Sequence, residues 1–217
     1  MGEIHALSGV SFDAKSGEFV VVVGPSGSGK TTLLNLLGGM ESPTAGSMCV
    51  DGKNIENFTA RQLTDYRRES IGFVFQFYNL MPNLTALENV ELAVEICKNP
   101  LNPKEVLEQV GLGERLKNFP AQLSGGEQQR VSIARSVAKN AKIILCDEPT
   151  GALDYETGKK ILKLLYSVCK EQNKTVLLVT HNSALKDMAD KVIVMKNGLI
   201  ENTIINDNPT PIENIDW

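Results

Sequence analysis

Gly24-Pro25-Ser26-Gly27-Ser28-Gly29-Lys30-Thr31 is the stretch that decides the fold, because it fits the pattern G-x-x-x-x-G-K-[ST]. A buried strand is predicted before it at residues 19–23, and a helix after it at residues 31–37. Such a loop turns its backbone N–H groups inward at a helix N-terminus, where negative charge is favoured. A chain of this length matches the pattern by chance about once in a hundred, and the flanking elements lower that chance further. The sequence therefore predicts a phosphate-binding loop.

The residues of this loop have separable roles. Lys30 is predicted to reach the β- and γ-phosphates of a nucleotide, and the Thr31 hydroxyl to ligate Mg²⁺. The nucleotide-binding residues expected here are Gly24, Pro25, Ser26, Gly27, Ser28, Gly29, Lys30, Thr31 and Thr32.

Size and composition limit the class of protein. The 217 residues suffice for one domain, with or without an inserted subdomain. The net charge of −4 gives no overall basic footprint, so we expect no nucleic-acid partner. The four cysteines are widely spaced, which favours reduced core residues over a disulfide framework or a metal site. No apolar run reaches membrane-spanning length, so we expect a soluble chain whose membrane role would depend on a partner.

The hydrophobic pattern predicts an α/β fold in two parts. Continuous apolar runs at residues 19–23, 142–146 and 175–179 suit a parallel sheet covered on both faces. Residues 77–140 are helical in pattern, and we interpret them as a subdomain inserted into an α/β core of residues 1–76 and 141–217. The other predicted elements are strands at 4–12, 47–50 and 71–75, helices at 60–68, 155–171 and 184–189, and a hairpin at 192–200. The predicted helix caps are the boxes Thr59/Gln62, Thr85/Glu88 and Ser124/Glu127, and also Asn102 and Asp154.

Two carboxylates follow the apolar strand at residues 142–146. Asp147 is predicted to hold Mg²⁺ through water, and Glu148 to orient and deprotonate an attacking water. An Asp-Glu pair after a strand is often a solvated loop, but the phosphate-binding loop favours the catalytic interpretation.

Leu123-Ser124-Gly125-Gly126-Glu127 begins a helix in an unusual way. A structural helix would carry the Ser124/Glu127 capping box, but it does not explain Gly125 and Gly126, which cost helix stability. Their bare N–H groups and the Ser124 hydroxyl are expected to face a second phosphate. A chain of this length contains these five residues in this order by chance in roughly a few cases per ten thousand.

Together these motifs resemble the nucleotide-binding subunit of ABC transporters. The resemblance rests on the phosphate-binding loop, Gln76 after a strand, residues 123–127, the Asp147-Glu148 pair, Ala152-Leu153-Asp154 and His181. These motifs occur in order and at the usual spacing over essentially the whole chain, and residues 73–80 and 148–154 look like the macrolide-export and lipoprotein-release branch. The implied fold is a P-loop NTPase with a RecA-like parallel-sheet core, an inserted helical subdomain and a small antiparallel β region.

The resemblance also implies an ATPase with ATP and Mg²⁺ as cofactors. Gln76 would sense Mg²⁺ and the attacking water and signal to the helical subdomain, and His181 would contact the γ-phosphate. The implied catalytic residues are Glu148, His181, Gln76 and Lys30, and the implied metal-site residues are Thr31, Gln76 and Asp147.

A second copy of the chain is the first implied partner. Ser124 and Gly126 would close on the γ-phosphate of the nucleotide held by Lys30 of the other copy, and Asp154 would contact that copy. The expected nucleotide-binding residues therefore also include Ser124, Gly125, Gly126, Glu127 and Asp154. The other implied partner is an integral-membrane permease for export or for lipid or peptide extraction. The chain would then be peripheral, at the cytoplasmic face of the plasma (inner) membrane.

The front of the chain departs from the family pattern. Family members usually carry a further N-terminal strand and then an aromatic residue that stacks on adenine. No Tyr or Phe precedes Phe12, which is itself expected in a core strand. Either the start is truncated or another group holds the base, with His5 as a weak substitute and otherwise an exposed residue.

Other functions stay open at this point. An ABC ATPase of the cell-division type would regulate a membrane partner without transport. One acting on nucleic acid or ribosomes ranks lower, because such proteins usually have two cassettes or long coiled-coil arms. A P-loop kinase or small GTPase does not explain residues 123–127, and the guanine-reading N-K-x-D is absent from the sequence.

Overall fold

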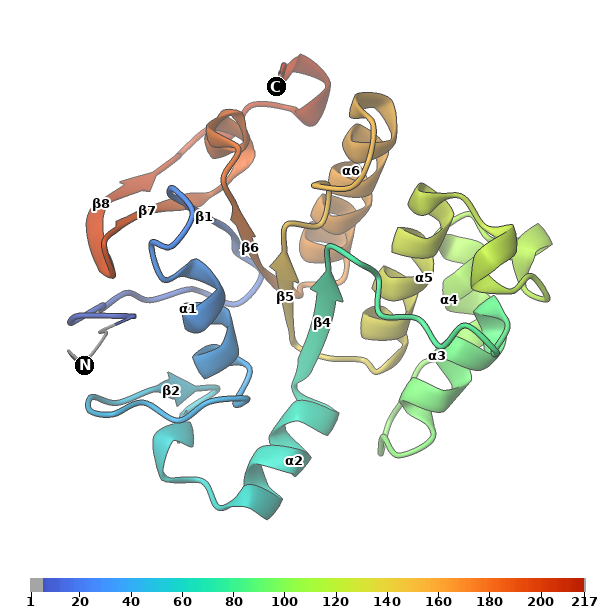
Figure 1. Ribbon diagram of the computed structural model, residues 1–217, viewed down its shortest axis with the longest axis horizontal. Coiled ribbons are helices and arrows are strands. Elements are labelled where there is room, and N and C mark those ends of the chain that lie inside the picture. Colours follow the sequence, from blue (N-terminus) through green and yellow to red (C-terminus); the bar gives the residue numbers. More distant parts are fainter. Residues whose placement is uncertain (1–5, 217) are drawn as a thin grey trace.

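A six-stranded sheet forms the centre of the computed structural model, which describes residues 6–216 (Figure 1). The strand order is β4-β5-β6-β1-β7-β8; the first five strands are parallel, and β8 is antiparallel to β7. The strands are β1 Phe19–Val23, β4 Ile71–Phe75, β5 Ile143–Asp147, β6 Thr175–Thr180, β7 Lys191–Lys196 and β8 Leu199–Ile205. The predicted parallel core is confirmed, and a ligand is expected beyond the carboxyl ends of its strands.

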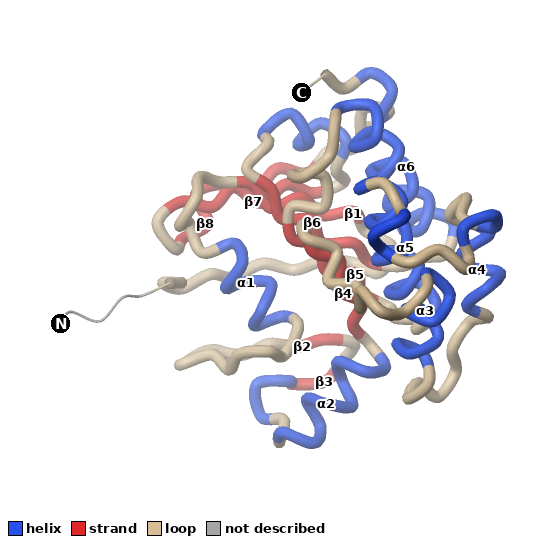
Figure 2. The backbone as a smooth tube through the Cα atoms, turned by 45° about the vertical axis from the view of Figure 1, so that its right-hand side comes forward, coloured by secondary structure: helices blue, strands red, loops and turns tan. Residues whose placement is uncertain are grey.

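Helices cover both faces of the sheet, which is why its strands are continuously apolar. In β1, Val20 and Val22 belong to one apolar cluster, whereas Phe19 and Val21 belong to the other. Helices α1 and α2 contribute to the first cluster, and α3 to α6 contribute to the second. In both views α1 and α5 lie on opposite sides of β4 and β5 (Figures 1 and 2). The helices are α1 Lys30–Leu37, α2 Ala60–Glu69, α3 Ala86–Val94, α4 Pro103–Gln109, α5 Gly125–Ala138 and α6 Tyr155–Glu171.

The helix starts follow the predicted caps. The hydroxyls of Thr59, Thr85 and Ser124 each accept a hydrogen bond from the N–H three residues on, and the side chain there accepts one from the cap N–H. Asn102 caps α4 just before Pro103, and Asp154 caps α6. Since an uncapped helix start leaves backbone donors unsatisfied, these polar side chains fix where each helix begins.

Helices α3, α4 and α5 lie between β4 and β5 in the chain and pack against one another. Helix α5 also packs on β4, where Ser136 Oγ donates a hydrogen bond to the Phe73 carbonyl oxygen (2.9 Å). Residues 77–140 stay our prediction for a helical subdomain, with α5 as the helix shared between it and the core.

The front of the chain differs from the prediction. Residues 6–12 form no strand, and residues 4 and 5 lie outside the described part. The Ser8 N–H donates to the Gly198 carbonyl oxygen (2.8 Å), but a strand needs a continuous ladder. The two-residue strands β2 (Cys49–Val50) and β3 (Lys53–Asn54) pair with each other in a separate antiparallel sheet. The short helix predicted near residue 184 is a 3₁₀ helix, η4 (Ser183–Met188).

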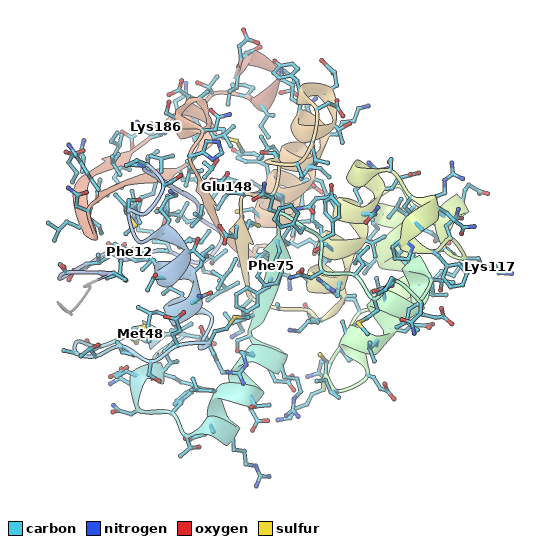
Figure 3. All side chains as sticks on the ribbon, in the orientation of Figure 1. Phe12, Met48, Phe75, Lys117, Glu148 and Lys186 are labelled. Atoms are coloured by element: carbon cyan, nitrogen blue, oxygen red, sulfur yellow. The ribbon has the colours of Figure 1, made fainter. Side chains whose placement is uncertain are left out.

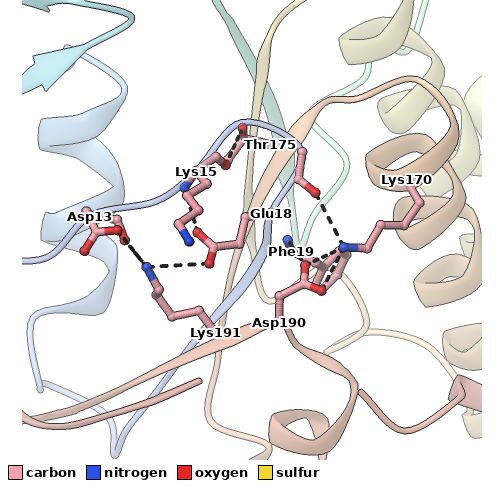
Figure 4. Close-up of polar contacts among 9 residues, drawn as sticks. Asp13, Lys15, Glu18, Phe19, Lys170, Thr175, Asp190 and Lys191 are labelled. Carbon is pink, nitrogen blue, oxygen red and sulfur yellow. Dashed lines mark hydrogen bonds and ion pairs between the residues drawn. The ribbon is translucent and has the colours of Figure 1, made fainter. Parts of the chain in front are cut away.

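A charge network closes the amino end of the sheet (Figure 4). Lys191 Nζ lies 2.9 Å from Asp13 Oδ2, and its side chain is only 6% exposed. Asp190 accepts a hydrogen bond from the Phe19 N–H (2.6 Å) and pairs with Lys170 (2.6 Å). Since a buried ammonium or carboxylate is costly without a partner, these pairs fix the chain where β1 and β7 begin. The opposite, carboxyl end of the sheet is left for the phosphate-binding loop.

Among residues 6–216, no helix combines the length and the apolar character needed to cross a membrane.

Candidate functional site

The phosphate-binding loop joins β1 to α1 and is shaped by Gly29 and Lys30. Gly29 has φ 95°, a left-handed conformation that residues with a side chain rarely adopt. Lys30 is buried, and its Nζ donates to the carbonyl oxygens of Gly24 (2.8 Å) and Pro25 (3.0 Å). An ammonium has three donors, so a third is available to a phosphate oxygen. Ser28 Oγ is buried with no hydrogen-bond partner in the described part of the chain. These polar groups fit the phosphates of a nucleotide.

Four of the predicted site residues meet at the carboxyl ends of β4 and β5. Thr31, Gln76, Asp147 and Glu148 line one cleft of about 310 Å³, together with Phe75, Phe77 and Asn79. Figure 3 labels Phe75 and Glu148, which lie at these neighbouring strand ends in the middle of the molecule. The start of α1 and the ends of β4 and β5 thus bring these side chains to one cleft, although Thr31 and Asp147 are 116 residues apart in the chain.

The oxygen atoms of this cleft fit Mg²⁺. Thr31 Oγ1 donates to Asp147 Oδ2 (3.3 Å), and Gln76 lines the same cleft. Burial raises the pKa of the Asp147 carboxyl above its usual range; the Thr31 hydrogen bond opposes this shift, and the negative charge of Glu148 adds to it. Within residues 6–216, no group of three or more His, Cys, Asp or Glu side chains is arranged to hold a metal. That is compatible with Mg²⁺, which takes one or two carboxylates and completes its shell with water and substrate phosphates.

Glu148 and His181 are in direct contact at the ends of β5 and β6. Glu148 Oε1 accepts from the His181 N–H (2.7 Å) and lies 2.7 Å from His181 Nδ1. Glu148 Oε2 accepts from the Thr180 hydroxyl (2.9 Å). The imidazole is 68% exposed while the carboxylate is 17% exposed, so His181 covers Glu148 from the solvent side. The sequence predicted both residues but not their pairing, and it missed Thr180. The available signal was a hydroxyl residue at the strand end, directly before His181.

The segment after Gln76 is fixed to helix α5. Tyr78 (φ 59°) and Asn79 (φ 50°) both have left-handed backbone conformations. Their carbonyl oxygens accept from the guanidinium of Arg135 on α5, at 3.0 and 2.6 Å. The Gln76 amide lies beside Gly151, where an added Cβ would be 3.0 Å from Gln76 Nε2. Gln76 therefore lines the cleft at the start of a segment whose next residues, Tyr78 and Asn79, are bonded to α5.

Neighbouring side chains lie close to both glycines at the start of α5. Packing therefore bears on the absence of side chains there, contrary to our interpretation of the sequence. A Cβ on Gly125 would lie 2.7 Å from Tyr78 Oη and 3.3 Å from Leu153 Cδ2. A Cβ on Gly126, which is buried, would overlap Thr157 Cγ2 on α6. A side chain at 126 therefore conflicts with the packing of α6, and one at 125 would require the end of the Tyr78 side chain to move. A phosphate-binding role for the two N–H groups stays a prediction.

Other predicted site residues lie outside the cleft. In the described part of the chain, none of residues 124–127 lines it. Ser124 is exposed, and Asp154 accepts from the Thr157 N–H (3.0 Å) as the cap of α6. His5 lies outside the described residues. Phe12 is half-buried against the apolar cluster of α1 and α2, so it has the expected core position without the expected strand.

The parallel sheet, the glycine loop at a helix N-terminus and the carboxylates at the next strand ends define a P-loop nucleotide hydrolase. A sequence profile described as ABC transporter matches residues 7–151, two thirds of the chain. The chain belongs to the ABC transporter family, and it is an ATP-binding and ATP-hydrolysing cassette.

Relatives and a solved structure agree with this assignment. The lipoprotein-releasing system ATP-binding protein LolD 2 of Caulobacter vibrioides is 42% identical over 205 residues, covering 92% of this chain and 90% of the relative. It belongs to the branch that the sequence indicated. An ABC transporter ATP-binding protein of Mycoplasma pneumoniae is 45% identical over 214 residues, 97% of this chain. The chain spans 46% of the length of that relative.

The solved structure is the ATP-binding cassette MJ0796 of Methanocaldococcus jannaschii, as a dimer in a post-hydrolysis state bound to ADP and Pi. It shares 44% sequence identity with this chain and has a TM-score of 0.84, covering 94% of this chain and 93% of its own.

Proposed function

We propose that this chain powers a membrane transporter, by binding MgATP, pairing with a second copy and hydrolysing ATP at the shared interface. The observation that carries the proposal is the cleft in which Thr31, Gln76, Asp147 and Glu148 meet beside the phosphate-binding loop. Phosphoryl transfer needs a phosphate cradle, a metal site and a group that positions water within one site. We infer that this chain supplies all three, and that a second copy completes the phosphate site.

The loop residues hold the phosphates in this proposal. Lys30 directs its third N–H donor at the oxygens of the β- and γ-phosphates, and the N–H groups at the start of α1 complete the cradle. Thr31, Asp147 and Gln76 would hold Mg²⁺, which when bound neutralises charge on the phosphate oxygens.

Glu148 acts as the base for the attacking water. One water proton passes to the Glu148 carboxylate while the water oxygen forms a bond to the γ-phosphorus. The bond from that phosphorus to the bridging oxygen breaks, which releases ADP and phosphate. His181 stays bonded to Glu148 through Nδ1 and presents its exposed ring edge to the γ-phosphate.

Replacement of the base tests this function. Glu148→Gln keeps the shape of the side chain but removes its ability to take a proton. We expect kcat for ATP hydrolysis to fall by about 10²- to 10⁴-fold, the usual contribution of a general base, with MgATP still bound. A phosphate-release assay and calorimetric titration with MgATP measure the two quantities. Hydrolysis at the unmutated rate would leave Glu148 without this role.

An integral-membrane permease is the proposed second partner, which would hold the chain at the cytoplasmic face of the membrane. The name of LolD 2 places that relative in a lipoprotein-releasing system. Large apolar side chains are exposed between β4 and α4, namely Phe77 (76%), Met81 (48%), Leu92 (50%) and Ile96 (63%). Beside Leu92, the carboxylates of Glu88, Glu91 and Glu95 border a groove on α3. Exposed apolar side chains with acidic neighbours suit a cytoplasmic permease helix that has apolar and basic side chains.

Leu92→Glu tests this surface, because Leu92 is half exposed and its replacement should leave the fold intact. Tagged chain is incubated with detergent-solubilised membranes of the source organism, and retained membrane proteins are identified by mass spectrometry. We expect a polytopic protein retained by the unmutated chain and lost with Leu92→Glu. The control is Leu199→Glu, which changes a similarly exposed leucine (47%) on β8, at the other side of the molecule (Figure 1). Equal retention by both variants would contradict the proposed surface.

A further inference from the structure

Glu148 receives hydrogen bonds from two consecutive residues, and they divide its oxygens between them. His181 occupies Oε1 with its backbone N–H and with Nδ1, both at 2.7 Å. Thr180 occupies Oε2 with its hydroxyl at 2.9 Å. A carboxylate that acts as the base can only accept, so the His181 tautomer that fits this role carries its proton on Nδ1.

The two carboxylate oxygens are therefore not equivalent as proton acceptors. Each oxygen has two lone-pair directions. Both directions on Oε1 are taken by His181, whereas the Thr180 hydroxyl takes one of the two on Oε2. The direction that stays open to a water proton belongs to Oε2, the oxygen that Thr180 holds.

The direction of the Thr180 hydroxyl is itself fixed. Thr180 Oγ1 accepts from the Asn182 N–H (3.0 Å), so its own proton points away from that donor and toward Glu148. The Thr180 side chain is 1% exposed at the last position of β6, and a β-branched side chain is stiff at χ1. Asn182 is in turn held as the cap of η4, where its side chain accepts from the Ala184 N–H (3.1 Å). The hydroxyl is therefore a directed donor.

We propose that Thr180 is a positioning residue for hydrolysis, whose hydroxyl orients Oε2 of Glu148 as the oxygen that takes the proton of the attacking water. This rests on the proposed function, in which Glu148 is the base. Without the hydroxyl, the carboxylate keeps its bonds to His181 but turns more freely about its terminal torsion, which has a broad energy well. Proton transfer then loses its geometry while the phosphate-binding loop is untouched.

Two matched substitutions test the proposal. Thr180→Val removes the hydroxyl and keeps the branched shape, whereas Thr180→Ser keeps the hydroxyl and loses a methyl group. We expect Thr180→Val to lower kcat for MgATP hydrolysis by roughly 10- to 100-fold, as for a lost hydrogen bond to a charged group. KM for ATP should change by less than about threefold, since ground-state binding is not involved. Thr180→Ser should keep kcat close to that of the unmutated protein.

Thr175→Val is the control. Thr175 lies at the amino end of β6, where its hydroxyl donates to the Lys15 carbonyl oxygen, and its replacement should leave kcat unchanged.

Three results would overturn the proposal: an unchanged kcat in Thr180→Val, a loss that Thr180→Ser does not restore, or a loss that appears as raised KM. If Thr180→Val does not fold, as judged by its melting curve, Thr180→Ala takes its place with the same expectations. Glu148→Gln is measured in parallel to separate the two levels of inference. If it hydrolyses ATP normally, the base assignment fails; if it stalls while Thr180→Val is fully active, only the role of Thr180 fails.

Discussion

Glu148 has φ 48°, a left-handed conformation that residues other than glycine seldom adopt. Its N–H donates to the Val179 carbonyl oxygen (3.0 Å), and its own carbonyl oxygen accepts from the Gly151 N–H (3.0 Å). Backbone strain of this kind costs on the order of 1–3 kcal/mol and persists only where the surroundings fix it. The turn aims the carboxylate away from β5 and toward the end of β6, where Thr180 and His181 lie.

The same residue shows how far the sequence can predict the site. Asp147 and Glu148 were predictable because they follow an apolar run in a chain with a phosphate-binding loop, and the carboxyl ends of parallel strands meet at one edge. The role of His181 was predicted only through the family resemblance. The hydrogen bond from Thr180 was not predictable, because it depends on the left-handed turn at Glu148 and on the register in which Asp147 pairs beside Val179. A local motif gives the residue types, whereas pairing across strands gives their contacts.

Among the elements, helix α5 shows both a correct prediction and a wrong one. Its start at Ser124 followed from the capping box, which is a local interaction within four residues. The interpretation that packing leaves Gly125 and Gly126 unexplained was wrong, because their neighbours Tyr78 and Thr157 come from distant parts of the chain, while the phosphate role of their N–H groups stays a prediction. The strand predicted over residues 4–12 does not form in its described part, residues 6–12, where Ser8 bonds to Gly198 but no ladder continues from that bond.

A double-mutant cycle tests the packing explanation. Gly126→Ala places a methyl group against Thr157 Cγ2, and we expect it to lower the free energy of unfolding by about 1–3 kcal/mol, as overpacking does. Thr157→Ser removes that methyl group, so the double variant should recover most of the loss. Urea unfolding of the four proteins measures the coupling, and additive effects would contradict the contact. If the repaired double variant still binds ATP but fails to dimerise, the bare residue at 126 also serves the nucleotide.

For the whole molecule, the arrangement of the two motifs suggests why one copy would not complete the site. Helix α1 follows the phosphate-binding loop and packs on one face of the sheet. Helix α5 follows its cap residue Ser124 and packs on the other face (Figures 1 and 2). The order of motifs along the chain says nothing about these faces, so this separation required the structure. Ser124 is exposed and does not line the cleft of its own chain, so we propose that it contacts the nucleotide bound to another copy. The similar cassette MJ0796 is a dimer bound to ADP and Pi.

Stalled hydrolysis tests this shared site directly. Glu148→Gln should bind MgATP without consuming it, so unhydrolysed nucleotide should hold two chains together and move the protein to dimer size in size-exclusion chromatography. Adding Ser124→Arg should prevent the shift, because the larger side chain blocks the start of α5 where the nucleotide of the other copy would lie. Ser124→Ala is the control for bulk: it loses the same helix cap, worth about 1 kcal/mol, and the hydroxyl that would face the nucleotide, but it leaves the start of α5 open, so it should weaken the dimer less than Ser124→Arg does. Melting curves confirm that each variant is folded. A Glu148→Gln protein that stays monomeric at saturating MgATP would contradict the shared site, and a dimer that survives Ser124→Arg would place the interface away from α5.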